Sequence, residues 1–167
     1  SISQRDYRAN VTILSGDIGT ANSTSDNCYH VLVSVNESTA HTLDGFTITK
    51  GNANGGTNAT INGQTGIWAN NGGAMYFYVS NTTISNCIFE DNYGQYGGAI
   101  KDVGSTLAFA NTIFANNEAF NHGGAFDKSY GNPASFVNCV FYNNTANRTS
   151  STMGGALQLG VATAGTT

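Results

Sequence analysis

The chain has 167 residues, enough for one domain of ordinary size, with a formal net charge of −4 and only 10% charged residues. No basic stripe is present, so nucleic acid is not an expected partner, and no apolar run approaches the roughly 18 residues of a membrane-spanning helix. Many aromatic residues with few charges argue against intrinsic disorder, because apolar surface is available for burial.

Short β-branched segments come first along the chain. "VTILSGDI" (residues 11–18) and "YHVLVSV" (29–35) predict strands, and "TLDGFTITKGNA" (42–53) resembles the later "TISNCIFEDN" (83–92). Gly45 and Asn86 occupy matching positions 41 residues apart, which is one unit of 25 plus 16. We therefore predict a loop inserted at residues 51–66.

From residue 72 the sequence repeats with a period of about 25 residues. Each unit opens with Gly-Gly, has an Asn in its middle and closes with Phe-x-x-Asn. Gly-Gly pairs begin 25, 26 and 31 residues apart, and the middle Asn and the Phe recur at 25 and 27. The repeat positions are Gly72, Gly73, Asn86, Phe89, Asn92; Gly97, Gly98, Asn111, Phe114, Asn117; Gly123, Gly124, Asn138, Phe141, Asn144; and Gly154, Gly155 of a unit that is not closed.

A unit of short strands and tight bends corresponds to one coil of a parallel β-helix (β-solenoid), in which coils stack at roughly 4.8 Å. We predict an all-β fold of about five partial coils, with residues 1–167 as one segment of a longer solenoid. Glycine fits the sharp corners, asparagine side chains stack as amide ladders, and phenylalanine forms an aromatic column. Cys87 and Cys139 would lie about 9.6 Å apart, too far for a disulfide.

Alignment by column places opposite charges on neighbouring coils. Lys101 falls beside Asp127, and Asp102 beside Lys128. Such cross-strand pairs stabilise by about 0.2–1 kcal/mol each. A catalytic Lys/Asp site on this sheet is the alternative, but each acid already has a basic partner.

Aromatic residues suggest a ligand face. Tyr76 and Tyr78 follow the first Gly-Gly-Ala, while Tyr93, Tyr96 and Phe120 are expected in loops after the Phe-x-x-Asn closures. Exposed rings stack on sugar faces or anchor a protein partner. Packing at the edge of a small core is the alternative.

The sequence contains no clear catalytic cluster. Carboxylates do not gather in any column, as an acid–base pair or a calcium site would require. Asp91 aligns with Asn116 and Asn143, which leaves open weak calcium binding or a plain polar turn. The histidines are dispersed without metal-ligand spacing. We therefore expect no catalytic, cofactor-binding or metal-binding residues, no cofactor, and no enzymatic activity.

The motifs "GGAM", "GGAI", "GGAF" and "GGAL", alternating with "FEDN", "FANN" and "FYNN", resemble the repeats of the chlamydial polymorphic membrane proteins and of secreted bacterial right-handed β-helix proteins. The resemblance implies a right-handed β-helix that is secreted or displayed on the outer cell surface. It implies an adhesin or passenger rod, and it provides no catalytic residues.

The expected function is therefore a non-catalytic extracellular or cell-surface rod, acting as an adhesin or as a structural, filament-forming subunit. Its expected partners are neighbouring copies, through end-to-end strand stacking, or a host or surface ligand such as a glycan. The alternative is a β-helix that binds or degrades polysaccharide, as a lyase or hydrolase would. Fold analogy alone does not decide between them.

Overall fold

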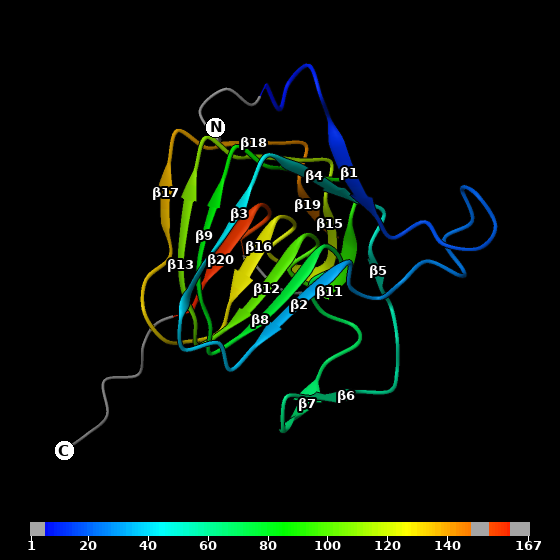
Figure 1. Ribbon diagram of the computed structural model, residues 1–167. Helices are drawn as coiled ribbons and strands as arrows, with labels where there is room; N and C mark the ends of the chain where they lie inside the picture. Colours follow the sequence, from blue (N-terminus) through cyan, green and yellow to red (C-terminus); the bar gives the residue numbers. More distant parts are fainter. Residues whose placement is uncertain (1–5, 148–153, 161–167) are drawn as a thin grey trace.

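The computed structural model describes residues 6–147 and 154–160. Within them it contains 20 β-strands, and the four main sheets are entirely parallel (Figure 1). The predicted all-β parallel β-helix is thus confirmed.

Four sheets form the faces of the solenoid. Sheet 1 contains β2 (Leu32–Val35), β8 (Met75–Tyr78), β12 (Ile100–Val103), β16 (Phe126–Lys128) and β20 (Leu157–Leu159). Sheet 2 contains β3 (Ala40–Asp44), β9 (Asn81–Ser85), β13 (Thr106–Ala110) and β17 (Ser135–Val137). Sheet 3 contains β1 (Thr12–Ser15), β4 (Phe46–Thr49), β10 (Ile88–Glu90), β14 (Ile113–Ala115) and β18 (Val140–Tyr142). Sheet 4 contains β5 (Asn52–Ala53), β11 (Tyr93–Tyr96), β15 (Glu118–His122) and β19 (Thr145–Ala146).

One coil passes through sheets 1, 2, 3 and 4 in turn. The groups β2–β5, β8–β11, β12–β15 and β16–β19 each complete such a circuit, and β1 and β20 flank them. The strand register pairs Phe89 with Phe114 and Phe114 with Phe141, as the column alignment predicts.

Stacked aromatic rings fill the interior. Phe89 and Phe114 lie 5.1 Å apart between ring centroids, and Phe114 and Phe141 lie 4.7 Å apart, both pairs nearly parallel. Phe109 and Phe136, on sheet 2, form a second stack at 4.8 Å. Because adjacent strand residues point to opposite faces, the residue that precedes each phenylalanine of the Phe89–Phe114–Phe141 stack faces outward. Their exposure increases along the stack: Ile88 and Ile113 are half-buried, and Val140 is exposed.

The middle asparagines form the corner between sheets 2 and 3. Asn86, Asn111 and Asn138 have φ values of 54°, 49° and 51°, a left-handed conformation that asparagine tolerates better than most residues. Their amides bond coil to coil, with Nδ2 donating to the Oδ1 of the previous coil at 3.3 and 3.4 Å. This ladder lies largely in solvent.

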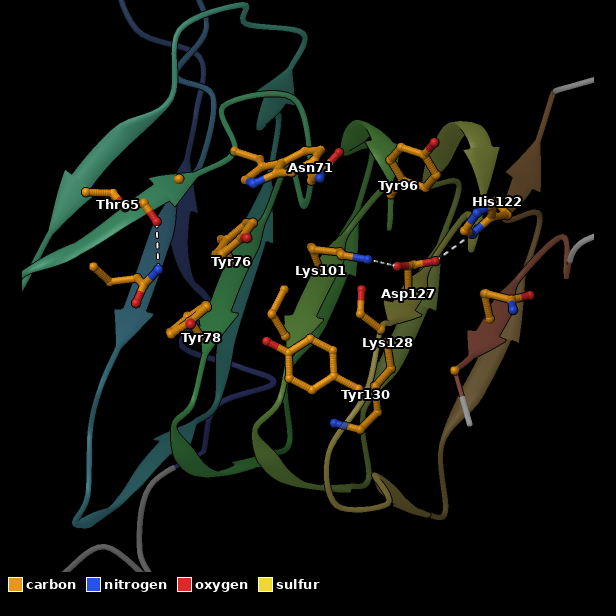
Figure 2. A pocket seen from close by; sticks show the side chains of 17 residues that line it. Thr65, Asn71, Tyr76, Tyr78, Tyr96, Lys101, His122, Asp127, Lys128 and Tyr130 are labelled. Carbon is orange, nitrogen blue, oxygen red and sulfur yellow. Dashed lines mark hydrogen bonds and ion pairs between the residues drawn. The ribbon is translucent and has the colours of Figure 1, made fainter. Parts of the chain in front are cut away.

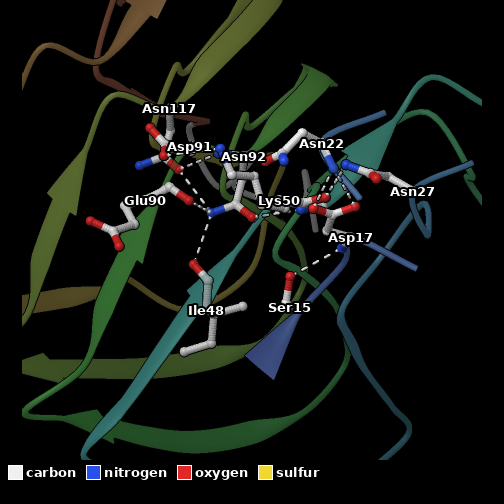
Figure 3. Close-up of polar contacts among 11 residues, drawn as sticks. Ser15, Asp17, Asn22, Asn27, Ile48, Lys50, Glu90, Asp91, Asn92 and Asn117 are labelled. Atoms are coloured by element: carbon white, nitrogen blue, oxygen red, sulfur yellow. Dashed lines mark hydrogen bonds and ion pairs between the residues drawn. The ribbon is translucent and has the colours of Figure 1, made fainter. Parts of the chain in front are cut away.

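The closing asparagines form a second ladder inside the solenoid (Figure 3). Asn117 Oδ1 accepts from the main-chain N–H and the amide of Asn92, at 3.1 and 3.0 Å. Asn117 Nδ2 donates to Phe89 O at 2.8 Å and to Asn144 Oδ1 at 2.9 Å. Each side chain therefore satisfies the buried backbone of one coil and the amide of the next.

The Gly-Gly pairs form the corner between sheets 4 and 1. Gly97 has φ +65°, and a Cβ on Gly98 would overlap the carbonyl oxygens of Glu118 and Gly124. Glycine is needed here because the coils approach through their backbones.

The insertion starts later and ends later than the loop expected at residues 51–66. Asn52 and Ala53 pair with Tyr93 and Gly94 as strand β5 of the coil. The projecting part contains the antiparallel hairpin of β6 (Ala59–Ile61) and β7 (Gln64–Ile67), seen at the bottom of Figure 1. Ile67 is buried against Val35 and Tyr76, so the hairpin folds back onto sheet 1. Cys28 and Cys139 are free thiols, whereas Cys87 is buried and its thiol donates to the carbonyl oxygens of Ser85 and Leu43.

We predict that the buried ladder stabilises the fold much more than the exposed one. Asn117→Ala leaves the buried main-chain N–H of Asn92 without its acceptor and removes the amide bonds to Asn92, Phe89 O and Asn144, so it should lower the free energy of unfolding by about 3 kcal/mol or more. Asn111→Gly keeps the left-handed corner and should cost at most about 1 kcal/mol. Urea unfolding measures both, and similar losses would contradict this assignment.

Candidate functional site

A groove with a volume of about 630 Å³ lies on the outer face of sheet 1 (Figure 2). Strands β8, β12 and β16 form its floor, and the insertion, through Thr65 and Trp68, forms one wall. The groove exists because the hairpin stands beside an otherwise open sheet.

Two rows of residues, one residue per coil, line the groove. The residues before the Gly-Gly corners, Asn71, Tyr96 and His122, follow one another in strand register. The second row, on sheet 1, is Tyr76, Lys101, Asp127 and Gln158. The second row faces the groove because the alternate residues of sheet 1, such as Ile100 and Phe126, point into the core.

Four aromatic residues, Trp68, Tyr78, Tyr96 and Tyr130, surround this polar floor. Trp68 and Tyr130 are 49% and 47% exposed. Tyr78 and Tyr96 are half-buried, and the ring of Tyr96 lies edge-on to His122, with 4.7 Å between centroids. The groove therefore offers rigid apolar rings next to hydrogen-bonding groups.

Tyr76 is less accessible than a ligand face requires. It is 2% exposed, because the insertion packs over it, whereas Tyr78 remains half-buried. Burial raises the pKa of Tyr76 to about 12. Tyr76 thus mainly supports the groove, and the exposed face is provided by other rings.

Asp127 is the centre of the polar floor. Its Oδ1 forms an ion pair with Lys101, and its Oδ2 accepts a hydrogen bond from His122 Nδ1 at 2.6 Å. Lys101 Nζ also lies 5.6 Å from the centre of the Tyr96 ring. With Nδ1 donating to the carboxylate, a neutral His122 carries its lone pair on Nε2.

The second ion pair, Asp102 with Lys128, lies inside the coil beneath the groove. Asp102 is 0% exposed, and Lys128 is 3% exposed. Asp102 Oδ1 accepts from Ser105 N at 3.0 Å, and Lys128 Nζ donates to Ser105 O at 2.9 Å. Burial raises the pKa of Asp102, and the bond to Lys128 opposes this rise. Both expected ion pairs form, but they are buried. The stabilisation of about 0.2–1 kcal/mol expected for each cross-strand pair therefore does not apply to them.

The structure differs from the expectations drawn from the sequence at several aromatic residues and at one histidine. Tyr93, Tyr96 and Phe120 lie in strands β11 and β15 and not in loops, because sheet 4 is a regular face of the coil. The repeat pattern does not mark Trp68, Tyr130 or His122 as site residues, although all three line the groove. Reading the column that precedes each Gly-Gly pair would have aligned Asn71, Tyr96 and His122.

The turn column with Asp91 contains ordinary polar contacts. Asp91 Oδ2 lies 3.3 Å from Lys50 Nζ (Figure 3), and Asn143 Nδ2 donates to Asn116 Oδ1 at 3.3 Å. Within residues 6–147 and 154–160, no three His, Cys, Asp or Glu side chains gather as a metal site would require. No helix in that part of the chain has the length and hydropathy of a membrane span.

Comparison with known families agrees with this architecture. A family model described as "Right handed beta helix region" matches residues 9–162, which is most of the chain. The protein therefore belongs to the right-handed β-helix family, and the expected handedness is confirmed. No curated protein and no solved structure matches the chain.

We predict strong coupling between Asp102 and Lys128. Asp102→Asn keeps an acceptor for Ser105 N but leaves the ammonium buried without a countercharge, so it should cost about 3–5 kcal/mol of stability. Adding Lys128→Met removes that charge and should recover at least half of the loss. Chemical denaturation of the two single variants and the double variant measures the coupling, and additive losses would argue against it.

Proposed function

We propose that this protein is a non-catalytic, extracellular β-helix rod that binds a glycan along the outer face of sheet 1. The observation that carries the proposal is the groove, in which four aromatic side chains surround a hydrogen-bonding floor. Sugar rings present apolar C–H faces and a rim of hydroxyls, which match such a surface. The extracellular location rests on the resemblance of the repeats to those of secreted and surface proteins.

Binding without cleavage is supported by the state of the carboxylates. A hydrolase of the usual kind needs two carboxyl groups on either side of the scissile bond. Among the described residues that line the groove, Asp127 is the one acidic side chain, and both of its oxygens already have partners. Asp102 lies below the floor and is paired with Lys128. An adhesive role agrees with this arrangement.

We predict that exposed groove aromatics are required for binding. Tyr130→Ala and Trp68→Ala each remove a ring from the groove and should weaken binding about tenfold, equivalent to about 1.4 kcal/mol. Phe120→Ala is the matched control, because Phe120 is 53% exposed and lies outside the groove. Affinity electrophoresis in gels cast with soluble polysaccharides measures the effect. If a polysaccharide that retards the wild-type protein retards all three variants equally, the proposal is contradicted.

A filament-forming role is the second candidate. The last strand of each sheet, β17 to β20, has a neighbour on one side within the described residues, and Val137 and Leu159 are 59% and 55% exposed there. Such edges accept a further strand, from more of the same chain or from another copy. Electron microscopy at micromolar concentration, with light scattering, tests this role. Regular filaments would support it, and a stable monomer would count against it.

A further inference from the structure

We infer that the groove selects an uncharged, hydroxyl-rich glycan and discriminates against acidic polysaccharides. This inference rests on the proposed glycan binding and names the chemical class of the ligand. It depends on the charges of the groove floor and on one buried acceptor at its rim.

The charges of the groove are already balanced within the protein. Two lysines belong to its lining, Lys101 and Lys128, and their ammonium groups are each paired with a carboxylate, on Asp127 and Asp102. Among the described lining residues no cation is left without a countercharge. A carboxylate on the ligand would therefore have to compete with Asp127 for Lys101, or lose its hydration without a partner. The net charge of −4 adds a weaker, general repulsion.

Asn71 provides an independent indication. Its side chain lines the groove, it is 3% exposed, and its buried Oδ1 has no hydrogen-bond partner. Its position is set by the backbone, because Asn71 N donates to Trp68 O at 3.1 Å and the residue bridges to Tyr96. A buried acceptor without a donor is costly, and a ligand hydroxyl satisfies it. A carboxylate has no proton to donate there.

The arrangement of these groups suits a chain of sugars. The floor row from Tyr76 to Gln158 crosses four neighbouring strands and so extends about 14 Å, three spacings of roughly 4.8 Å. Exposed rings lie at its borders, on Trp68 and Tyr130, and Asn71 lies in the row beside it with His122. Sugar faces then pack on the rings while hydroxyls meet the polar row, with the glycan running along the solenoid axis.

The test compares pairs of polymers that differ in one group per sugar, a primary hydroxyl in one and a carboxylate in the other. A panel of soluble neutral polysaccharides (glucans, mannans, galactans, xylans) is prepared. For each hexose polymer, a derivative is made by oxidising the primary hydroxyl to a carboxylate. Affinities for the wild-type protein are measured by isothermal titration calorimetry, with and without calcium. We expect at least one neutral hexose polymer to bind, its carboxylated derivative to bind about tenfold more weakly or worse, and calcium to have no effect.

Two variants assign the selectivity to residues. Asp127→Asn leaves Lys101 without a countercharge. It should therefore narrow or reverse the difference in affinity between each neutral polymer and its carboxylated derivative. Asn71→Leu removes the acceptor and should weaken binding of the neutral polymer several-fold. Phe120→Ala is the matched control and should change neither the charge selectivity nor the affinity for the neutral polymer. Circular dichroism melting shows whether each variant is folded, and the wild-type comparison of paired polymers needs no variant.

The two levels of the proposal fail in different ways. If carboxylated derivatives bind as tightly as their neutral parents or more tightly, the charge selectivity is wrong and glycan binding stands. Calcium-dependent binding of acidic polymers alone would also overturn it. If no polymer of the panel binds to the wild-type protein, the proposed function fails and this inference fails with it.

Discussion

In-register stacking of identical side chains between coils is the constraint on which this structure depends. Parallel strands repeat by a simple translation of roughly 4.8 Å, so a residue in one coil meets its equivalent in the next. Phenylalanine rings then stack at 4.7–5.1 Å, and Asn117 connects the coils of Asn92 and Asn144. Asparagine suits this position because one amide both donates and accepts. Each coil is stable only because its neighbours satisfy its buried polar groups.

The same translation governs the groove. One residue per coil points outward at each position, so the floor is a row of four different side chains: Tyr76, Lys101, Asp127 and Gln158. Core columns must keep similar residues to stack, whereas outward columns are free to vary. Function is therefore expected in the columns that break the repeat, and the repeating columns maintain the spacing between them.

The insertion converts a flat face into a recess without disturbing the coils. It leaves after β5 and returns before β8, two strands that keep their places in sheets 4 and 1. Ile67 packs on Val35 and Tyr76, which fixes the hairpin against sheet 1 and brings Trp68 to the groove. The ion pairs Lys101–Asp127 and, beneath it, Lys128–Asp102 keep the floor electrically neutral. The insertion and these ion pairs together leave aromatic rings and uncharged polar groups accessible to a ligand.

The sequence by itself determined the all-β class, the coil, the Phe and Asn columns and both Lys–Asp partnerships, because a constant period converts spacing directly into contact. Only the tertiary structure decided which face each column points to, since the corners reset the alternation of the strands. It also decided the burial of Tyr76 and the meeting of Trp68, His122 and Asp127. These residues come from the insertion, sheet 4 and sheet 1, and their proximity depends on how an irregular hairpin folds back and how the Gly-Gly corner turns. No period in the sequence records either of these.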